Sequence, residues 1–427
     1  MKKIFNTIGL VACCAAVFAT ATANAQDEKL TIMSSQGWIT EAEEELGAAF
    51  EKETGIAVDY QIIPADQYYN VLLARLNTGE GPDIFGGQSG YSDLLSYKVE
   101  ENAIDLSDQP WAERLDPLVA ATSSLGDKLY GLTYWDTVGN TWVMNYNIAL
   151  FEEHNVAVPT NYNELRSACE TFSEAGITPM YEPFADGWHH VLMFAEMGPN
   201  YASNSDGLVE ALNANTTTLA ENETMQTTLT QINELYQSGC FGDDALSDQF
   251  SGMTKAFTSN ETAMVYAQMS FYGAVQNDFP DYDISNIGLF VPPFGDSQFI
   301  NMNPAGPTKF VYSGGDNQEA ALQYLDFLTR PENAAAYIAH PAGAKNLPFN
   351  DAKGGFPENV LSFLDANSDN RGIVLQTSVN YVNPQWMDIG QDMTAMVTGQ
   401  IKPERVLSNI DKRRANVAKA AGDEGWK

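Results

Sequence analysis

The sequence has few basic side chains and few histidines for its length. Its 427 residues include 22 Lys and Arg against 56 Asp and Glu, and only four His. The formal net charge of −34 repels nucleic acids and anionic membrane surfaces, so no nucleic-acid partner is expected. We interpret the acidic excess as a solubilising surface, of the kind that a salty habitat favours, rather than as a binding feature.

Cysteine is scarce as well. Two of the four cysteines, Cys13 and Cys14, lie near the N-terminus, which leaves Cys169 and Cys240 in the rest of the chain. In an oxidising compartment this pair can form a disulfide. Because the sequence does not give the distance between them, two separate buried thiols remain the alternative.

A long apolar run occurs only near the N-terminus. Lys2 and Lys3 precede the largely apolar residues 8–18, and residues 23–25 (Ala-Asn-Ala) have the small-x-small form of a cleavage site. This pattern predicts a signal peptide over residues 1–25, so we expect an exported, periplasmic protein. Elsewhere no segment approaches the roughly 20 apolar residues that span a bilayer, so the mature chain is expected to be soluble.

A lipoprotein signal is the alternative to cleavage after Ala25. Residues 10–13 fit a lipoprotein cleavage box, which would leave Cys13 acylated. The apolar run before Cys13 is short, and the residues after it continue the apolar core instead of forming a polar tether. We therefore favour release after Ala25, and either interpretation gives an exported protein.

Strand and helix patterns alternate over the first part of the mature chain. Thr40 and Glu43 have the spacing of a capping box at the start of one helix, which Gly55 ends, and Asp66 is the expected cap of the next helix. The expected strands are residues 30–33, 56–63 and 83–85. Strands separated by helices at this spacing form right-handed parallel crossovers, so this part is predicted to be an α/β lobe.

Three candidate ligand contacts follow these expected strands. Ligands of parallel α/β sheets bind in the crevice beyond the carboxyl ends of the strands. Trp38, Asp66 and Gln88 each come shortly after one strand. We therefore expect these side chains to lie at the same edge of the sheet.

Residues 129–151 organise the middle of the chain. A strand pattern over residues 130–134 breaks at residues 135–140, which include Trp135, Asp136 and Gly139, and an apolar strand resumes at residues 141–146. The two strands either form a hairpin in one sheet or connect two lobes. A chain of 427 residues exceeds the size at which single cores stop growing, so two lobes are expected.

The later chain continues the α/β pattern. Expected strands are residues 176–180, 261–268, 287–293 and 310–312, and expected helices are residues 160–171, 208–239, 250–257 and 317–328. The strands at 287–293 and 310–312 are expected to return to the first lobe. The tail from residue 357 is predicted to be helical, and its basic run at residues 412–414 is interpreted as a solvated helix face.

Signatures of catalysis and of metal binding are weak. No HExxH motif occurs, and the Gly87-Gln88-Ser89-Gly90 segment lacks the glycine spacing of a nucleophile elbow. Adjacent histidines on a strand, such as the His189–His190 pair, would face opposite sides. A calcium-like loop from residue 365 lacks the required glycine and the final glutamate. We assign no catalytic residue, metal or cofactor and do not expect an enzyme. The sequence does not exclude a pair of catalytic carboxylates, as in a glycosidase, among its 56 Asp and Glu residues.

Aromatic residues beside small polar ones form the stronger signal. Trp111 and Trp142 fall inside expected elements and are assigned to packing. The others lie in loops or at expected strand ends: Trp38, Trp135, Trp188, Phe271, Tyr272 and Trp386. Flat rings stack on the C–H faces of sugars while neighbouring polar groups bind hydroxyls. Lys and Arg are scarce in the same loops, which favours a neutral ligand; the alternative is that these rings only cover the core.

The order of several short motifs resembles one family. Residues 50–58 (Phe-Glu-Lys-Glu-Thr-Gly-Ile-Ala-Val), residues 79–85 (Gly-Glu-Gly-Pro-Asp-Ile-Phe) and the Tyr-Gly-Leu of residues 130–132 occur in that order. They are followed by Thr178-Pro179, Ala263-Met264 and Pro292-Pro293. Over almost the whole mature chain this resembles the family 1 extracellular solute-binding proteins of ABC importers, the group that contains maltose-binding protein.

The resemblance implies a two-lobed, periplasmic-binding-protein-like α/β fold of type II. Two sheets flanked by helices would enclose a ligand cleft and close by hinge motion. The expected division is an N-terminal lobe of residues 26–135 plus about 300–342, and a C-terminal lobe of residues 136–299 plus about 343–427, which includes the closing helices.

The resemblance also implies the ligand-facing positions. Gln88 and Ser89 match the loop after the third strand, and Asp136 matches the segment that crosses between lobes. The family often has a tryptophan near the position of Phe271 and Tyr272, and its absence here puts the stacking partner in doubt. With the residue-based candidates, the expected site comprises Trp38, Asp66, Gln88, Ser89, Trp135, Asp136, Trp188, Phe271, Tyr272 and Trp386.

The function implied is that of a monomeric binding protein without cofactor. It would capture a neutral mono- or oligosaccharide and deliver it to the membrane subunits of an ABC permease. The alternatives are a receptor of the same fold for a polyol or another non-sugar solute, and a secreted glycan hydrolase.

Overall fold

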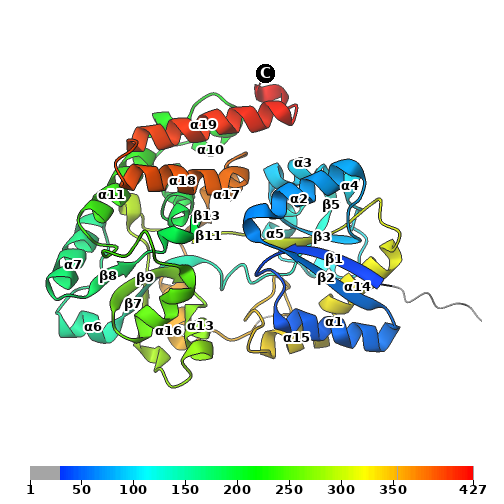
Figure 1. The fold of residues 1–427 in the computed structure, drawn as a ribbon, viewed down its shortest axis with the longest axis horizontal. Coiled ribbons are helices and arrows are strands. Elements are labelled where there is room, and N and C mark those ends of the chain that lie inside the picture. The colour runs from blue at the N-terminus through cyan, green and yellow to red at the C-terminus, as the bar shows by residue number, and fades with distance from the viewer. Residues whose placement is uncertain (1–28, 353, 427) are drawn as a thin grey trace, which may run out of the picture.

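The computed structural model describes residues 29–352 and 354–426, which form two α/β lobes lying side by side (Figure 1). The predicted signal peptide and the alternative acylation site Cys13 lie outside the described residues. Within the described part of the chain, no helix combines the length and the apolar character needed to cross a membrane.

The first lobe is built on a five-stranded sheet with the order β2-β1-β3-β12-β6. The strands are β1 (Lys29–Ser35), β2 (Ala57–Ile63), β3 (Ile84–Gln88), β6 (Gly131–Thr133) and β12 (Pro307–Val311). β1 is parallel to both β2 and β3, which confirms the predicted crossovers, and β12 lies antiparallel between β3 and β6.

Alternate side chains of these strands point to opposite faces of the sheet, and both faces are buried. Leu30 and Ile32 of β1 face one core together with Phe50 of α1, whereas Met33 faces a second core together with Leu72 of α2. The helices of the first lobe are α1 (Glu41–Thr54), α2 (Ala65–Thr78), α3 (Tyr91–Tyr97), α4 (Val99–Asn102), α5 (Pro117–Thr122), α14 (Gln318–Thr329) and α15 (Pro331–Ala339), with a small ribbon of β4 (Ser124–Leu125) and β5 (Lys128–Leu129). A sheet covered on both faces presents its ligand edge only at the strand ends.

The second lobe contains a four-stranded sheet with the order β10-β7-β9-β8. Its strands are β7 (Trp142–Asn147), β8 (Thr178–Tyr181), β9 (Thr262–Gln268) and β10 (Ile287–Phe290), and a separate parallel pair joins β11 (Ile300–Met302) to β13 (Arg371–Ile373). Met144 and Met264 face one core, and Val143 and Val265 face the other. The period of two again places helices on both sides.

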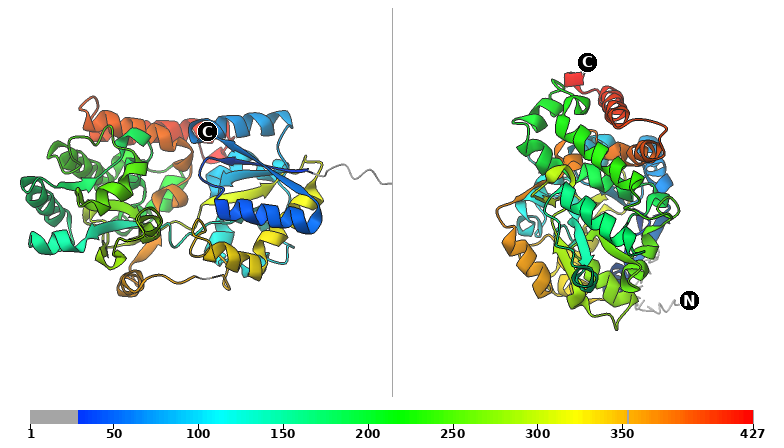
Figure 2. Two further views of the ribbon diagram at one scale, coloured as in Figure 1. Left: turned by 60° about the horizontal axis from the view of Figure 1, so that its bottom comes forward. Right: turned by 90° about the vertical axis from the view of Figure 1, so that its left-hand side faces the viewer.

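The helices of the second lobe surround this sheet and extend along its upper edge (Figure 2). They are α6 (Ile148–Glu153), α7 (Tyr162–Glu174), α8 (Leu192–Ala195), α9 (Gly198–Ser203), α10 (Leu208–Asn213), α11 (Glu223–Gln237), α12 (Met253–Thr258), α13 (Phe271–Asp278), α16 (Glu358–Ala366), α17 (Leu375–Ser378), α18 (Trp386–Val397) and α19 (Pro403–Ala420). The end of α19 reaches the boundary between the lobes beside α3 (Figures 1 and 2).

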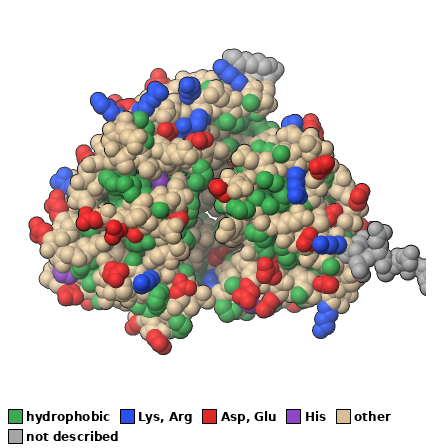
Figure 3. Space-filling model, in the orientation of Figure 1, with side chains coloured by type: hydrophobic (Ala, Val, Ile, Leu, Met, Phe, Trp, Pro, Cys, Tyr) green, Lys and Arg blue, Asp and Glu red, His purple; other side chains and the backbone are tan. Residues whose placement is uncertain are grey.

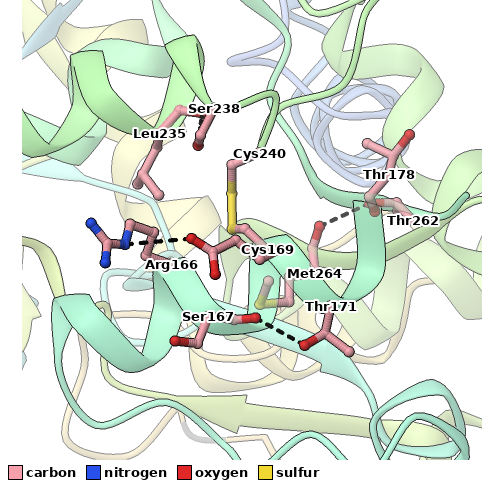
Figure 4. The surroundings of a disulfide bond; sticks show 11 residues. Arg166, Ser167, Cys169, Thr171, Thr178, Leu235, Ser238, Cys240, Thr262 and Met264 are labelled. Atoms are coloured by element: carbon pink, nitrogen blue, oxygen red, sulfur yellow. Dashed lines mark hydrogen bonds and ion pairs between the residues drawn. A yellow bond between two sulfur atoms is a disulfide. The ribbon is translucent and has the colours of Figure 1, made fainter. Parts of the chain in front are cut away.

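A disulfide joins α7 to the segment after α11. Cys169 and Cys240 form the bond across 71 residues of sequence, and both are buried. This settles the choice between a disulfide and two free thiols. It crosslinks the second lobe alone, close to β8 and β9 (Figure 4). A closed loop of this length is worth about 4 kcal/mol in the chain-entropy model.

Segments connect the lobes between β6 and β7, between β11 and β12, and between α15 and α16. Because β6 and β7 belong to different sheets, residues 129–151 form an interlobe connection and not a hairpin. Asp136 joins two of the connecting segments: Oδ1 accepts from the Gly139 N–H at 2.6 Å, and Oδ2 accepts from the Asn346 N–H at 3.1 Å.

Two expectations about the elements were wrong. β10 does not return to the first lobe; it pairs with β7, because Ile287 and Phe290 face the two cores of the second lobe. Asp66 does not cap α2, since that helix begins at Ala65 with Pro64 at the cap position, where the fixed φ of proline suits a helix start.

Two interpretations of charged residues also need correction. The capping box is half formed: Thr40 accepts from the Glu43 N–H, but the Glu43 carboxylate binds Lys309 Nζ at 3.0 Å instead of returning to the cap. The basic run at residues 412–414 is not simply a solvated face. Arg414 is buried, and Arg413 pairs with Asp392 at 2.7 Å.

Replacing Gly139 tests the joint at Asp136. A Cβ at position 139 would lie 2.2 Å from Asp136 Oδ2, so Gly139→Ala must displace the carboxylate from its two N–H donors. We expect the free energy of unfolding to fall by about 2 kcal/mol, as measured by urea denaturation. Gly355→Ala is the matched control, because a Cβ there meets no atom within 4 Å. Equal stability of the two variants would contradict the assigned joint.

Candidate functional site

The first-lobe side of the candidate site lies at the carboxyl ends of β1, β2 and β3, as predicted. Trp38 is partly exposed, and its ring meets the rings of Tyr68 and Tyr69 edge-on at 5.4 and 6.3 Å. Gln88 ends β3, with a partly exposed side chain and a backbone N–H that donates to Tyr97 Oη at 3.1 Å. Asp66 is exposed in the first turn of α2.

The second-lobe side is an aromatic ledge, which we define as Trp142, Trp188, Phe250 and Trp386. Trp188 packs against Phe250 at 5.3 Å and against Trp142 at 6.0 Å. The Trp386 Nε1–H donates to the Trp188 carbonyl at 3.0 Å, which ties the start of α18 to this loop. Trp188 and Trp386 remain partly exposed, whereas Trp142 is buried beneath them. The ledge therefore offers ring surface from the loop of Trp188 and from the start of α18.

Phe250 was missed in the sequence analysis. It follows Asp248 and Gln249, so the criterion of an aromatic beside polar residues applies to it, but it was placed at the start of the expected helix at residues 250–257 and was not named as a candidate. The structure begins a short 3-10 helix there, and the Phe250 N–H donates to the Asp186 carboxylate. Asp186 thereby fixes the ring against Trp188.

A chain of contacts links the two sides across the boundary between the lobes. Tyr97 Oη, which accepts from Gln88, donates to Asp93 Oδ1 at 3.4 Å. Asp93 Oδ2 accepts from Asn383 Nδ2 at 2.9 Å, and Asn383 lies three residues before Trp386. The surface is hollowed along this boundary (Figure 3). These contacts connect Gln88 to the segment just before Trp386 of the ledge.

Trp135 and Ser89 lie at a segment that connects the lobes. A Cβ at Gly306 would lie 3.0 Å from Trp135, which is partly exposed. Ser89 is buried, and its Oγ accepts from the Gly306 N–H at 3.1 Å, while its own N–H donates to the Gly306 carbonyl. Both residues therefore contact Gly306, in the segment that connects β11 to β12.

Asp136, Phe271 and Tyr272 are buried. Burial raises the pKa of Asp136, although the N–H groups of Gly139 and Asn346 oppose the shift. Burial first, and then the charge of Asp136, raise the pKa of Tyr272 to about 12, so the phenol is neutral and lies near that carboxylate. Phe271 and Tyr272 pack in a second-lobe core. The Asp136 oxygens are engaged by the backbone rather than free.

A buried histidine pair lies behind the ledge. His189 and His190 are in a 3-10 helix (His189–Val191), not in a strand. His189 Nδ1 lies 2.7 Å from Glu182 Oε1, and its ring meets Trp188 at 5.1 Å, whereas His190 Nε2 lies 2.8 Å from the Gly390 carbonyl. Within the described residues no group of three or more His, Cys, Asp or Glu side chains is arranged to hold a metal.

Glu196 is a second buried carboxylate in this lobe. Gln376 Nε2 donates to its Oε1, while Glu196 Oε2 and Gln376 Oε1 have no partner among the described residues. Burial raises the pKa of Glu196 to about 8. At pH 7 the carboxyl is therefore mostly protonated.

Comparisons with known proteins identify a family and a fold. A family model described as bacterial extracellular solute-binding protein matches residues 36–335. A search of the curated proteins finds no match. A chitin oligosaccharide binding protein has a TM-score of 0.74 at 16% identity, with 91% of this chain and 99% of that chain covered.

Two further solved structures are similar. A sugar transporter from Bacillus licheniformis in complex with stachyose has a TM-score of 0.71 at 16% identity, covering 91% of this chain and 100% of that chain. The protein RafE in complex with raffinose has a TM-score of 0.70 at 16% identity, covering 91% and 99%. The predicted two-lobed α/β fold is confirmed, and so is the family resemblance.

Replacing Glu196 tests the protonated pair. The folded pKa of about 8 lies above the usual value for an unfolded glutamate, so the wild-type chain loses stability as the pH rises from about 4.3 to about 8. Glu196→Gln keeps an uncharged partner for Gln376. Between pH 5 and pH 8 we expect the free energy of unfolding of this variant, measured by urea denaturation, to fall by about 1 kcal/mol or more less than that of the wild type.

The control is Glu210→Gln, at an exposed position of α10, which also replaces a glutamate by glutamine. It should leave the pH dependence of the free energy of unfolding as in the wild type. Identical slopes for the wild type and Glu196→Gln would show that Glu196 is ionised in the folded protein.

Proposed function

This chain belongs to the bacterial extracellular solute-binding proteins, and we propose that it captures a neutral mono- or oligosaccharide between its lobes and delivers it to the membrane subunits of an ABC permease. One observation carries the choice of a sugar. Trp188, in a loop, and Trp386, at the start of α18, have partly exposed side chains and are joined by a hydrogen bond. We propose that they lie across the ligand cleft from the polar end of β3. Sugar recognition needs stacking surface and hydroxyl-binding groups together.

The charges near the cleft support a neutral ligand. Lys309 lines a small hollow beside Trp38, but it already pairs with Glu43. Arg413 donates to Gln385, the neighbour of Trp386, and pairs with Asp392. A phosphate or carboxylate ligand is normally met by a free guanidinium or ammonium group. The ligands named for the similar structures, chitin oligosaccharides, stachyose and raffinose, also support a sugar.

In this proposal the ligand contacts are Trp38, Gln88, Trp135, Trp188 and Trp386, with Phe250 and Trp142 supporting the ledge. Asp66 would add a polar group at the first-lobe rim. Ser89, Asp136, Phe271 and Tyr272 would shape the cleft from beneath, because their polar atoms are buried or engaged. The protein would act as an exported, periplasmic monomer without catalytic activity.

We start from lobes of residues 26–135 with about 300–342, and of residues 136–299 with about 343–427. The pairing of β11 with β13 supports moving residues 300–302 to the second lobe, and the packing of Leu347 and Phe349 with Leu30 and Ile32 supports extending the first lobe to about residue 352. Closure would move one lobe against the other about the connecting segments, and a ligand favours the closed state only through contacts with both lobes. Gln88 on one wall and Trp188 on the other provide such a pair.

A thermal-shift panel tests the choice of ligand. We expect a few neutral sugars from a broad panel to raise the melting temperature, since ligand at 100 times its Kd stabilises the native state by about 2.7 kcal/mol. A shift with polyols or amino acids and none with any sugar would reject the proposal. Release of reducing ends from oligosaccharides would favour the hydrolase instead.

Trp188→Ala tests the ledge. Removal of the stacking ring should weaken the sugar found in the panel roughly tenfold to a hundredfold, about 1.4 to 2.8 kcal/mol, in isothermal titration calorimetry. Tyr282→Ala is the matched control, because Tyr282 is a partly buried aromatic of the same lobe that packs against Phe257, outside the ledge. Equal affinities of the two variants would remove Trp188 from the site.

A further inference from the structure

The lobes also meet through side chains that are far from the connecting segments in sequence. Ser92 and Asp93 of α3 belong to the first lobe, and Tyr381 and Asn383 belong to the second. The Tyr381 N–H donates to Ser92 Oγ at 2.6 Å, and Asn383 Nδ2 donates to Asp93 Oδ2 at 2.9 Å. Ser92 and Asp93 are buried, at 7% and 4% exposure.

The second-lobe half of this contact is held by the C-terminal helix. Tyr381 has a φ of 65°, in the left-handed region that a bulky residue rarely adopts. Its Oη donates to Asp423 at 2.8 Å, and Arg414 Nε donates to the Asn380 carbonyl at 2.9 Å. The Trp426 ring packs on Tyr381 at 6.0 Å. The strained loop therefore has its shape fixed within its own lobe.

The first-lobe half is tied to the candidate site. Asp93 Oδ1 accepts from Tyr97 Oη, and Tyr97 Oη accepts from the Gln88 N–H. Gln88 is a proposed ligand contact at the end of β3. A change in the position of Asp93 is therefore transmitted to the backbone of the loop that faces the ligand.

We propose that Asp93 and Asn383 form a proton-sensitive latch between the lobes, which holds the binding protein closed more firmly when Asp93 is protonated. This inference rests on the two-lobed site of the proposed function and adds a regulation of that site. In this proposal the hydrogen bonds between the lobes belong to the closed state, in which the carboxyl is buried, and separating the lobes exposes it to water. A buried carboxylate without a cationic partner is costly, so its neutral form favours the closed state.

The surroundings of Asp93 provide no compensating charge. Among the described residues, Asp93 is in none of the ion pairs. The titratable groups that face it are the phenols of Tyr97 and of Tyr69 in α2. Glu100 and Glu101 of α4 are exposed, and neither β4 nor the 3-10 helix Asn383–Gln385 has a titratable side chain.

The direction of the pH dependence follows from burial. Burial raises the pKa of Asp93 to about 7 in this arrangement, against the hydrogen bonds from Asn383 and Tyr97. In water an aspartate has a pKa near 3.9. Closure therefore takes up a proton between about pH 4 and pH 7, and the ratio of closed to open molecules rises by up to tenfold for each unit of falling pH in that window.

The test measures lobe separation without any ligand. Cys169 and Cys240 are in a disulfide, so cysteines introduced at the exposed Leu118 of the first lobe and Leu246 of the second can be spin-labelled selectively in the mature protein. Distance distributions are recorded at pH 5 and pH 8.5. We expect a larger closed fraction at pH 5 in the wild type.

Two variants separate the latch from general charge repulsion. Asp93→Asn is neutral at every pH, so its closed fraction should vary far less between pH 5 and pH 8.5 than that of the wild type. Asn383→Ala removes the donor and should lower the closed fraction at pH 8.5. Asp108→Asn, which removes an exposed carboxylate of the first lobe, should keep the wild-type response.

An Asp93→Asn variant that keeps the full wild-type pH response would overturn the latch. A wild type with the same distances at both pH values would overturn it as well. Because no sugar is present in these measurements, failure of the latch is distinguishable from failure of the sugar panel.

Discussion

The structure depends on how the segments between the lobes are held together. The Asp136 carboxylate accepts one N–H from its own segment and one from the segment that leads to α16. A buried carboxylate is tolerable only when donors surround it, and here the donors belong to two of the segments that connect the lobes. The family resemblance pointed to Asp136 as ligand-facing. In the structure its two oxygens instead hold two connecting segments together, and a ligand hydroxyl would have to compete with those backbone N–H groups.

Three buried carboxyl groups of this acidic protein are stabilised in three different ways. Asp136 is surrounded by backbone donors, Glu196 is mostly protonated beside Gln376, and Asp93 lies between the lobes with an amide as its partner. Asp136 and Asp93 each accept two hydrogen bonds, and Glu196 accepts one. Burial raises the pKa of both Glu196 and Asp93, but of these two only Asp93 lies at a contact between the lobes, so in our proposal only its titration is coupled to lobe separation.

Local patterns were sufficient to predict most of the fold, and they failed where distant residues decide. The expected strand at residues 30–33 is confirmed as β1, and the structure shows that it is buried on both faces. The Glu43 carboxylate could not be placed, because its partner Lys309 lies 266 residues away in sequence. β10 was assigned to the wrong lobe for the same reason, since an apolar strand of four residues fits either sheet.

The candidate site was also harder to predict where residues distant in sequence determine it. Aromatic residues beside polar ones identified Trp188 and Trp386, which lie in contact, but the same signal in Phe250 was overridden by a helix pattern. The sequence also could not reveal that Gln88 is connected through Tyr97 and Asp93 to the second lobe. In a cleft protein the ligand and the lobe-to-lobe contacts draw on one closure equilibrium. Any residue that stabilises the closed state without touching the ligand therefore raises affinity, so the determinants of binding here extend beyond the residues that line the cleft.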